Sequence, residues 1–445
     1  MKKVLIIPAC TDLNRGDQAL VWEAAYLLED SLNNNDNDND IAIVDYGMNS
    51  QDRARQSKQT RDAGFKVIRN IVENPKRVNY KENDSEGVHA NKVQFIRAGL
   101  MALFDFFRHF LLLIMPSTKV FNVLFPNKEH QSAFEYIKNT DFFVVKGGGF
   151  LHTYGKLEDL YYLWFGLYYI LLAKRLGKKT ILLPNSVGPI TGWANRCFIK
   201  YVFNKIDLIY ARENISIECL ESIGVKHAKF GFDLGYYSKN DSLEILVNHK
   251  ENSNDTRLNV GITVRPYRFP GSSDPSEKYN NYINSIANFC NKYKSEIRFS
   301  FIVQVQGPSA HETDRIAIND VIEKLDDKVD YTVIDADRNY KQMLDVYSTL
   351  DYLIGTRFHS VIFAQISNIP SLAIAYGGNK TRGIMRKIGL EDYVIDIESI
   401  SSEELEVVFN NLVENKNDYQ SKLEKAKLDI EEDRSRIIDD IRGLL

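Results

Sequence analysis

The sequence predicts an α/β protein of two doubly wound domains that face a cleft. In each half of the chain, short apolar runs alternate with longer stretches of helical periodicity. Nearly continuous apolar strands separated by helices are typical of parallel sheets that are covered on both faces. With 445 residues, of which 44% are hydrophobic, the chain is long enough for two such domains with full cores.

The expected strands are apolar runs of four to nine residues. Those of the first half lie at 3–9, 41–46, 141–146, 179–184 and 206–211. Those of the second half lie at 258–264, 297–305, 331–335, 351–355, 370–375 and 393–396. Helical patterns such as 17–32 and 158–176 separate several of them, as the parallel arrangement requires.

A polar stretch without sustained periodicity, 238–257, divides the two halves and is the expected linker. We therefore expect an N-terminal domain over 1–237 and a C-terminal domain over 258–445. The stretch at about 47–130 departs from the strand and helix alternation and is expected to be an insert. The mixed charge after residue 400 is typical of solvated covering helices.

The composition favours a cytoplasmic protein that does not bind nucleic acid. The formal net charge is −4, whereas proteins that bind phosphate backbones usually have a strongly basic domain. The four cysteines form no CxxC pair, so they indicate reduced thiols. The first apolar run is too short for a secretion signal, and no window approaches the ~20 apolar residues of a membrane span. No His, Cys or carboxylate cluster suggests a metal, and we expect no bound cofactor.

The insert contains a basic stretch followed by an apolar one. Residues 51–97 hold 11 Lys or Arg against 6 Asp or Glu. The apolar block "LMALFDFFRHFLLLIMP", 100–116, follows and is interrupted by Asp105, Arg108 and His109. This block is either a core helix or a helix that rests on an anionic membrane surface beside the basic stretch.

Arginines follow several predicted strands, where parallel sheets bind their ligands. Arg212 follows 206–211, Arg265 and Arg268 follow 258–264, and Arg357 follows 351–355. Any one of them could instead pair with a core carboxylate. Together they favour an anionic ligand, because guanidinium groups bind phosphate and carboxylate in a bidentate manner.

Other polar or glycine residues share these strand exits. Asn14 and Asp17 follow the first strand, and Asp17 is the expected N-cap of the next helix. Three glycines, 147–149, form a tight turn or an amide nest, but match neither a dinucleotide nor a P-loop motif. Tyr376 and Lys380 follow the strand at 370–375, and Lys380 could reach the same anion.

His359 lies two residues after Arg357, with Phe358 between them. If a helix begins at 358, its amide end favours negative charge nearby. A histidine in such a place can transfer a proton near neutral pH, although a purely structural histidine would fit the same pattern.

Eight segments occur in a fixed order: "NRGDQAL", "GGGFL", "SVGPI", "ARE", "FDLGY", "TVRP", "GTRFHS" and "AYGGNKTRGI". From about residue 4 to about 390, this set resembles the polysaccharide pyruvyl transferase family. The resemblance implies a fold like glycosyltransferase type B, in which two Rossmann-like domains face a cleft. It also implies transfer of the pyruvyl group of phosphoenolpyruvate onto two sugar hydroxyls, which forms a cyclic ketal and releases phosphate. The family's arginine–hydrophobic–histidine motif, which holds the donor, maps onto Arg357, Phe358 and His359.

The residues and the resemblance together give one set of expected roles. We expect His359 and Asp17 to act as acid or base. The expected cleft-lining residues are Asn14, Gly147, Gly148, Gly149 and Tyr376. The expected donor-binding residues are Arg357, Phe358, Arg265, Arg212, Lys380 and Arg268.

The expected partners are phosphoenolpyruvate, on the side of the C-terminal domain, and a lipid-linked oligosaccharide containing a hexose, on the side of the N-terminal domain. The insert is longer than the family usually carries and gives no acceptor motif. We expect a cytoplasmic enzyme held peripherally at the inner membrane face through 51–116. Two alternatives remain at this stage: a type B glycosyltransferase that uses a nucleotide-sugar, and a non-catalytic protein that binds a small anion.

Overall fold

The computed structural model describes residues 2–8, 11–32, 39–80, 92–156, 158–239, 256–307, 312–335, 337–377 and 380–444. Two compact units divide the chain. Unit 1 comprises Met1–Asp12, Leu20–Leu234 and Asp433–Leu445, and unit 2 comprises Leu13–Ala19 and Gly235–Glu432.

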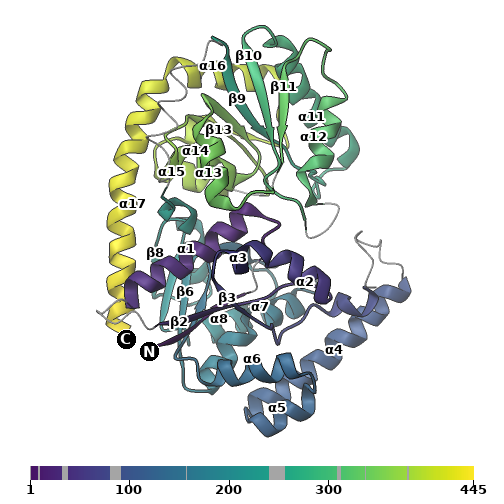
Figure 1. Ribbon diagram of the computed structural model, residues 1–445, viewed down its shortest axis with the longest axis vertical. Helices are drawn as coiled ribbons and strands as arrows, with labels where there is room; N and C mark the ends of the chain where they lie inside the picture. Colours follow the sequence, from purple (N-terminus) through teal and green to yellow (C-terminus); the bar gives the residue numbers. More distant parts are fainter. Residues whose placement is uncertain are drawn as a thin grey trace. The chain divides into compact units, whose positions relative to one another are not determined.

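Unit 1 contains a parallel sheet in the order β3-β2-β1-β4-β6-β7-β8, with β5 paired to β6. Figure 1 labels β2, β3, β6 and β8 of this sheet. Its strands are β1 Lys3–Ile7, β2 Asp40–Val44, β3 Lys66–Ile68, β4 Phe142–Val145, β5 Gly148–Leu151, β6 Lys179–Val187, β7 Leu208–Ala211 and β8 Ala228–Phe230. Its helices are α1 Arg15–Leu32, α2 Ser50–Gln56, α3 Lys58–Asp62, η1 Pro75–Asn79, α4 Lys92–Ile114, α5 Thr118–Leu124, α6 Lys128–Lys138, α7 Glu158–Arg175, α8 Trp193–Phe203 and α9 Asn214–Ser222. The first turn of α1 is counted with unit 2.

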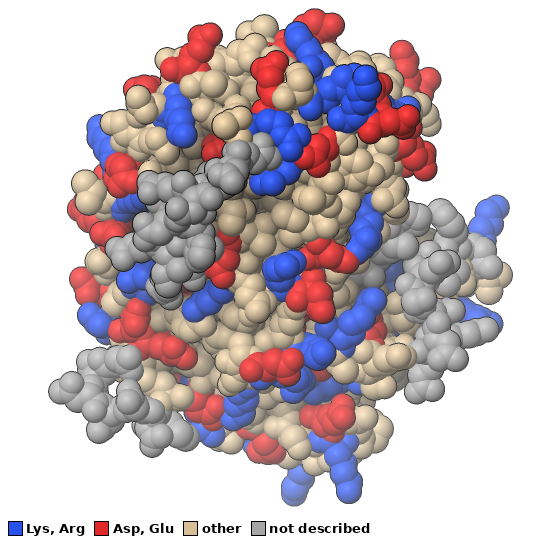
Figure 2. Space-filling view, turned by 45° about the horizontal axis from the view of Figure 1, so that its top comes forward, with Lys and Arg blue, Asp and Glu red and all other residues tan. Residues whose placement is uncertain are grey.

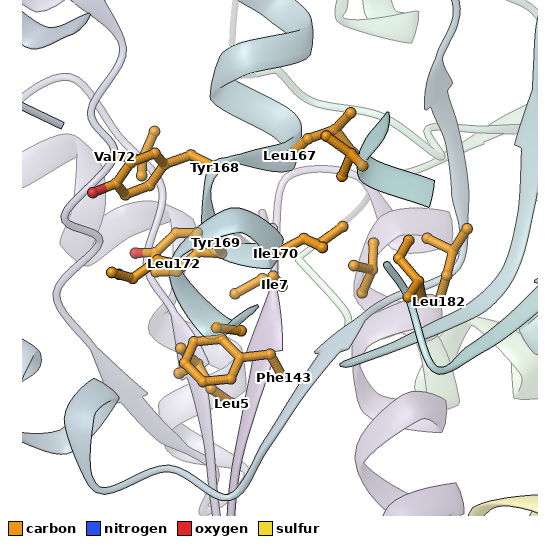
Figure 3. Close-up of a cluster of buried hydrophobic side chains, with 14 of the residues drawn as sticks. Leu5, Ile7, Val72, Phe143, Leu167, Tyr168, Tyr169, Ile170, Leu172 and Leu182 are labelled. Atoms are coloured by element: carbon orange, nitrogen blue, oxygen red, sulfur yellow. The ribbon is translucent and has the colours of Figure 1, made fainter. Parts of the chain in front are cut away.

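The core of unit 1 forms where α7 packs on the central strands (Figure 3). Leu5 and Ile7 of β1 and Phe143 of β4 are buried against apolar residues of α7 such as Leu167 and Ile170. The continuous apolar runs of these strands exist because helices cover both faces of a parallel sheet.

Unit 2 contains a second parallel sheet, in the order β11-β10-β9-β12-β13-β14. Its strands are β9 Leu258–Thr263, β10 Ile297–Ile302, β11 Tyr331–Ile334, β12 Tyr352–Gly355, β13 Ser371–Ala375 and β14 Val394–Asp396. Its other elements are η2 Leu234–Tyr237, α11 Pro275–Lys292, α12 Asp314–Ile322, α13 Tyr340–Ser348, α14 Phe358–Ile366, α15 Lys380–Lys387, η4 Glu391–Tyr393, α16 Ser402–Glu414 and α17 Lys416–Leu444. The end of α17, from Asp433, is counted with unit 1.

The predicted α/β class with parallel sheets is confirmed, and a strand lies in each predicted apolar run. Three short strands were missed: β3, β5 and β8. Of the glycines at 147–149, Gly148 and Gly149 begin β5. β3 and β8 are three-residue edge strands whose sequences, KVI and AKF, are too short to show a period.

The compact units differ from the predicted domains in two segments. Residues 13–19 belong to unit 2, and residues 433–445 belong to unit 1. Most of the predicted linker, 240–255, lies outside the described residues. The chain therefore passes from one unit to the other more than once, whereas a single linker at 238–257 would pass between them only once.

Candidate active site

The centre of the candidate site is the carboxyl edge of the unit 2 sheet. β12 pairs with β9 on one side and with β13 on the other, so Gly355 lies opposite both Thr263 and Ala373. The residues that leave these three strands are therefore neighbours, and they include Arg357, Arg265 and Tyr376.

Arg357 lies at the N-cap of α14 and forms an ion pair with Asp314, the first residue of α12. Its Nε and Nη2 lie 2.8 Å and 2.7 Å from Oδ1 of Asp314, and Nη2 also donates to the Glu312 carbonyl at 2.9 Å. The second oxygen of Asp314 accepts from the backbone N–H groups of Gln304 and Val305. Among the described residues Nη1 has no hydrogen-bond partner, so one edge of the guanidinium is open to a ligand.

Burial raises the pKa of the Asp314 carboxyl, which is 0% exposed, and the positive charge of Arg357 opposes that rise. Burial alone would lower the pKa of Arg357, but Asp314 more than offsets this and raises it. Arg357 therefore stays protonated at the start of α14.

A second arginine lies beside Tyr376. The guanidinium carbon of Arg265 is 3.9 Å from the centre of the Tyr376 ring, a close cation–π contact. Burial would raise the pKa of the Tyr376 phenol, but the charges of Arg265 and Arg357 outweigh burial and lower it. The contact with Arg265 and the pairing of β12 with β13 place Tyr376 and both arginines at the same edge of the sheet.

Hydroxyl groups fix the backbone of this region. Tyr282 accepts from the backbone N–H of Arg265 at 3.2 Å and lies 3.0 Å from Oγ1 of Thr356. Burial raises the pKa of Tyr282 to about 12, so it stays neutral. Ser360 lies 2.8 Å from Oγ1 of Thr263 and joins β9 to the start of α14. These contacts hold the two arginines in place.

His359 lies against the segment 13–19. Asn14 forms an antiparallel bridge with Val305, and the carbonyls of Gln304 and Leu13 accept from Arg15 and Gln306. A methyl group added at Gly16 would come within 2.4 Å of Cγ and Nδ1 of His359. The absence of a side chain at Gly16 therefore lets the first turn of α1 lie directly on the imidazole.

We expect Gly16→Ala to lower turnover because the imidazole of His359 must move to make room for the added methyl group. Overpacking of this kind costs about 1–3 kcal/mol, which exceeds the helix-propensity gain of about 1 kcal/mol from glycine to alanine. The matched control is Gly443→Ala, a helical glycine with no neighbour within 4 Å. Wild-type turnover in Gly16→Ala, at unchanged stability, would contradict this placement of His359.

Asn14, not Asp17, caps α1. Oδ1 of Asn14 accepts from the backbone N–H groups of Gly16 and Asp17, at 3.1 Å and 3.3 Å. Asp17 lies in the first turn, where its charge favours the helix dipole, and its side chain is half-buried. The N-cap expected from the sequence was wrong because the helix begins two residues earlier, at Arg15.

Arg212 belongs to unit 1 and lies in a buried network at the end of β7. It forms an ion pair with Asp233, and its Nε donates to Ser186 at 2.7 Å. Ser186 donates in turn to Glu213 at 2.9 Å. Arg212 thus pairs with a core carboxylate, which is the alternative that the sequence left open for each of the arginines.

The three glycines also belong to unit 1. An added Cβ at Gly147 would lie 3.0 Å from the Pro184 carbonyl, and Gly148 has a φ of +149°, which favours glycine. Gly149 is exposed, and its carbonyl lies 3.2 Å from Nδ1 of His152. Close packing therefore accounts for two of these glycines without a ligand.

The remaining predicted residues lie at the start of α14, in the loop after β9 and at the start of α15. Phe358 is half-buried as the first residue of α14, and Arg268 is exposed. The backbone of Lys380 begins α15, but its side chain lies outside the described part of the chain. Sequence reasoning missed Asp314, because the segment "ETDR" shows only a polar helix start.

The described residues on the face seen in Figure 2 form no continuous stripe of basic side chains. On the face seen in Figure 2, basic and acidic side chains are interspersed. Binding of a phosphate backbone would call for a continuous basic stripe. Among the described residues, no group of three or more His, Cys, Asp or Glu is placed to hold a metal ion.

Comparisons with solved structures agree on the fold. The chain is similar to Anabaena HepE, solved in complex with UDP-glucose, with a TM-score of 0.53 at 10% identity over 100% of this chain and 99% of that one. It is also similar to a putative UDP-N-acetylglucosamine 2-epimerase from Listeria monocytogenes, with a TM-score of 0.51 at 10% identity over 100% and 96% of the two chains. At these identities the likeness shows the fold alone, and it confirms the predicted glycosyltransferase type B-like class.

Comparisons of sequence give information on the family as well as on the fold. The amylovoran biosynthesis protein AmsJ of Erwinia amylovora is 23% identical over 301 residues, which cover 65% of this chain and 69% of AmsJ. The sequence profile of polysaccharide pyruvyl transferases matches residues 14–378, from the cap of α1 to just beyond Tyr376. The chain is therefore an enzyme of the polysaccharide pyruvyl transferase family.

Proposed function

We propose that this enzyme moves the pyruvyl group of phosphoenolpyruvate onto two hydroxyls of one sugar in a lipid-linked precursor of a surface polysaccharide. One hydroxyl adds to C2 of the donor while the methylene carbon takes a proton and becomes a methyl group. The C2–O bond to phosphate then breaks, and the oxocarbenium-like carbon is attacked by the second hydroxyl. The products are a cyclic ketal and inorganic phosphate.

The observation that carries this proposal is the pair of arginine charges around Tyr376 at the edge of the unit 2 sheet. Phosphoenolpyruvate carries a phosphate and a carboxylate on three carbons, so it needs several positive charges in one small space. Arg357 offers an open Nη1 edge, Arg265 lies next to Tyr376, and the amide end of α14 adds partial positive charge. Phe358, Lys380, Arg268 and, from unit 1, Arg212 remain proposed donor contacts.

The proposed proton donor to the methylene carbon is His359. It follows Arg357 on α14 and lies on the first turn of α1, so the fold holds it on the same element as the donor clamp. Asp17, one residue after Gly16, is the proposed base for an acceptor hydroxyl. Positioned acids and bases of this kind contribute about 10²–10⁴ in rate.

The proposed acceptor side is unit 1, with Gly147, Gly148 and Gly149 near the sugar. Asn14, which belongs to unit 2, remains a proposed cleft-lining residue. A lipid-linked acceptor would bring the enzyme to the inner face of the cytoplasmic membrane, where we propose that it attaches peripherally through the region 51–116. Among the described residues, no helix is long and apolar enough to cross a membrane.

The test is incubation with phosphoenolpyruvate and a panel of nitrophenyl and lipid-linked hexosides. We expect phosphate release that depends on the sugar, together with a gain of sugar mass that matches a pyruvyl ketal. Thermal shift with phosphoenolpyruvate and with nucleotide-sugars separates the alternatives, because a ligand stabilises by RT ln(1 + [L]/Kd). Stabilisation by UDP-glucose alone would favour a glycosyltransferase, and stabilisation by phosphoenolpyruvate without turnover would favour an anion-binding protein.

Activity should survive EDTA. The two arginines and the amide end of α14 supply the positive charge that a divalent ion would otherwise bring to the donor phosphate. The measurement is phosphate release before and after chelation, followed by addition of magnesium or manganese. Loss of activity that a divalent ion restores would show that a metal site takes part.

A further inference from the structure

Helix α4 packs on unit 1 through a side that holds its buried polar residues together with Leu112. The residues that face inward include Gln94, Ala98, Asp105 and His109, which recur at the spacing of one helix face. Asp105 is 1% exposed and accepts a bidentate contact from Arg77 at 2.7 Å and 2.8 Å. His109 donates from Nε2 to the Ile71 carbonyl at 3.0 Å, and burial lowers its pKa to about 4, so it is neutral.

The opposite side of α4 is apolar and exposed. We call it the α4 face and define it by six residues that are each more than half exposed: Phe95, Ile96, Leu100, Leu103, Phe104 and Phe107. Soluble helices usually turn such residues inward and polar ones outward. A contiguous exposed patch of this kind marks a surface that another apolar phase or partner covers.

The polar side of α4 is fixed in place, so the helix cannot simply turn over. Arg108 also contacts Asp105, and Arg175 of α7 donates to the carbonyls of Leu113 and Ile114 at the end of α4. Phe106 packs against Trp164 of α7 with ring centres 4.7 Å apart. Rotation of α4 would break the buried ion pair of Asp105, which is costly.

The exposed charged residues of α4 itself, Lys92 and Arg97, are basic, and an exposed Glu129 follows Lys128 further along the chain. Between residues 92 and 128 the only acidic residue is Asp105, which is buried. The exposed charged residues of this stretch are Lys92, Arg97, Lys119 and Lys128. An apolar helix face with basic residues at its borders matches a bilayer surface that contains anionic lipid.

A second copy of this chain fits the α4 face less well. A two-fold interface would bring the same patch of both subunits together and with it Lys92 and Arg97 of both copies, which raises the positive charge of the interface. An anionic lipid surface would instead pair with them.

We propose that the α4 face rests in the headgroup and upper acyl region of an anionic bilayer, with Lys92, Arg97 and Lys119 at the level of the lipid phosphates. This inference rests on the membrane location of the proposed function and gives it a defined surface. It also corrects the expected role of the basic stretch 51–97. Three of its arginines, Arg53, Arg69 and Arg77, pair with carboxylates of unit 1 and are not available to lipid.

The test is sedimentation of the full chain with vesicles of phosphatidylcholine containing phosphatidylglycerol, at low and high salt. We expect binding that falls with salt and is weak on pure phosphatidylcholine vesicles. Leu100→Ser with Phe107→Ser should weaken partitioning about tenfold or more, because both side chains are exposed and apolar. Lys92→Gln with Arg97→Gln should weaken it about fivefold per residue.

Matched controls lie in unit 2, on α16, on α17 and in the segment between α12 and β11. Val407→Ser with Leu428→Ser removes two equally exposed apolar side chains and should leave binding unchanged. Lys324→Gln with Lys328→Gln removes two exposed charges and should change binding little.

Three results would overturn the proposal: no binding to the anionic vesicles at low salt, equal loss in the control variants, or a dimer without lipid that Leu100→Ser with Phe107→Ser dissociates. The last result would assign the α4 face to a second copy. Phosphate release from phosphoenolpyruvate with a water-soluble hexoside, measured without vesicles, tests the proposed reaction separately. That activity should be the same in Leu100→Ser with Phe107→Ser as in the wild type.

Discussion

Arg357→Lys is expected to weaken phosphoenolpyruvate binding by about 10- to 100-fold while the protein stays folded, since a charged hydrogen bond contributes about 1.5–3 kcal/mol. Lysine keeps a positive charge beside Asp314 but lacks the planar fork that offers Nη1 to a ligand. Arg357→Ala should abolish binding and also reduce the free energy of unfolding by about 3–5 kcal/mol, because it leaves a buried carboxylate without its partner. Titration calorimetry with the donor and urea unfolding measure the two effects.

The control for Arg357→Lys is Arg257→Lys. Arg257 forms an ion pair with Asp330 at 2.7 Å, but this pair lies at the amino ends of β9 and β11, away from the carboxyl edge. It should not affect donor binding. If Arg357→Lys bound phosphoenolpyruvate as tightly as the wild type, Arg357 would be only the structural partner of Asp314.

His359→Gln should lower turnover by about 10²–10⁴ while phosphoenolpyruvate binding changes only a few-fold. The reason is that the guanidinium groups of Arg357 and Arg265 hold the donor by permanent charge, whereas His359 is proposed to move a proton. Glutamine keeps much of the volume of the imidazole beside Gly16 but cannot donate and accept a proton in the same way. The measurements are the turnover number across pH and the donor dissociation constant.

His227→Gln is the matched control for His359→Gln. His227 lies in unit 1 and contacts the Ile206 carbonyl at 3.2 Å, so it should affect stability slightly and turnover not at all. Near wild-type turnover of His359→Gln across the whole pH range would remove the proposed proton transfer. A loss of donor binding as large as the loss of turnover would make His359 part of the binding site instead.

The sequence predicted the strand exits well, because continuous apolar runs identify buried parallel strands directly. Arg357, Arg265 and Tyr376 were expected at one edge, and the register of β9, β12 and β13 makes them neighbours. The sequence could not predict which arginine pairs with which carboxylate. Asp314 is 43 residues from its partner Arg357, and Asp233 is 21 residues from its partner Arg212. Only the fold brings the members of each pair together.

The apolar block 100–116 shows a different limit of sequence reading. Its two interpretations, core helix and membrane-facing helix, were treated as exclusive. In the structure Asp105, His109 and Leu112 are buried while Leu100 and Phe107 are exposed. Hydropathy alone predicts the opposite orientation, because it gives no sign that Arg77 is placed to bind the one carboxylate of the helix.

The contribution of residues 13–19 to unit 2 has a consequence for how the enzyme is made. The turn of α1 that lies on His359 leaves the ribosome before the body of unit 1. Its partners, which lie just after β10 and in α13 and α14, are translated only after that body. The neighbourhood of His359 therefore cannot be complete until late in synthesis. For the same reason, a recombinant fragment that begins at residue 235 would lack the strip of backbone beside His359 and would have to recover it from a separately supplied N-terminal peptide.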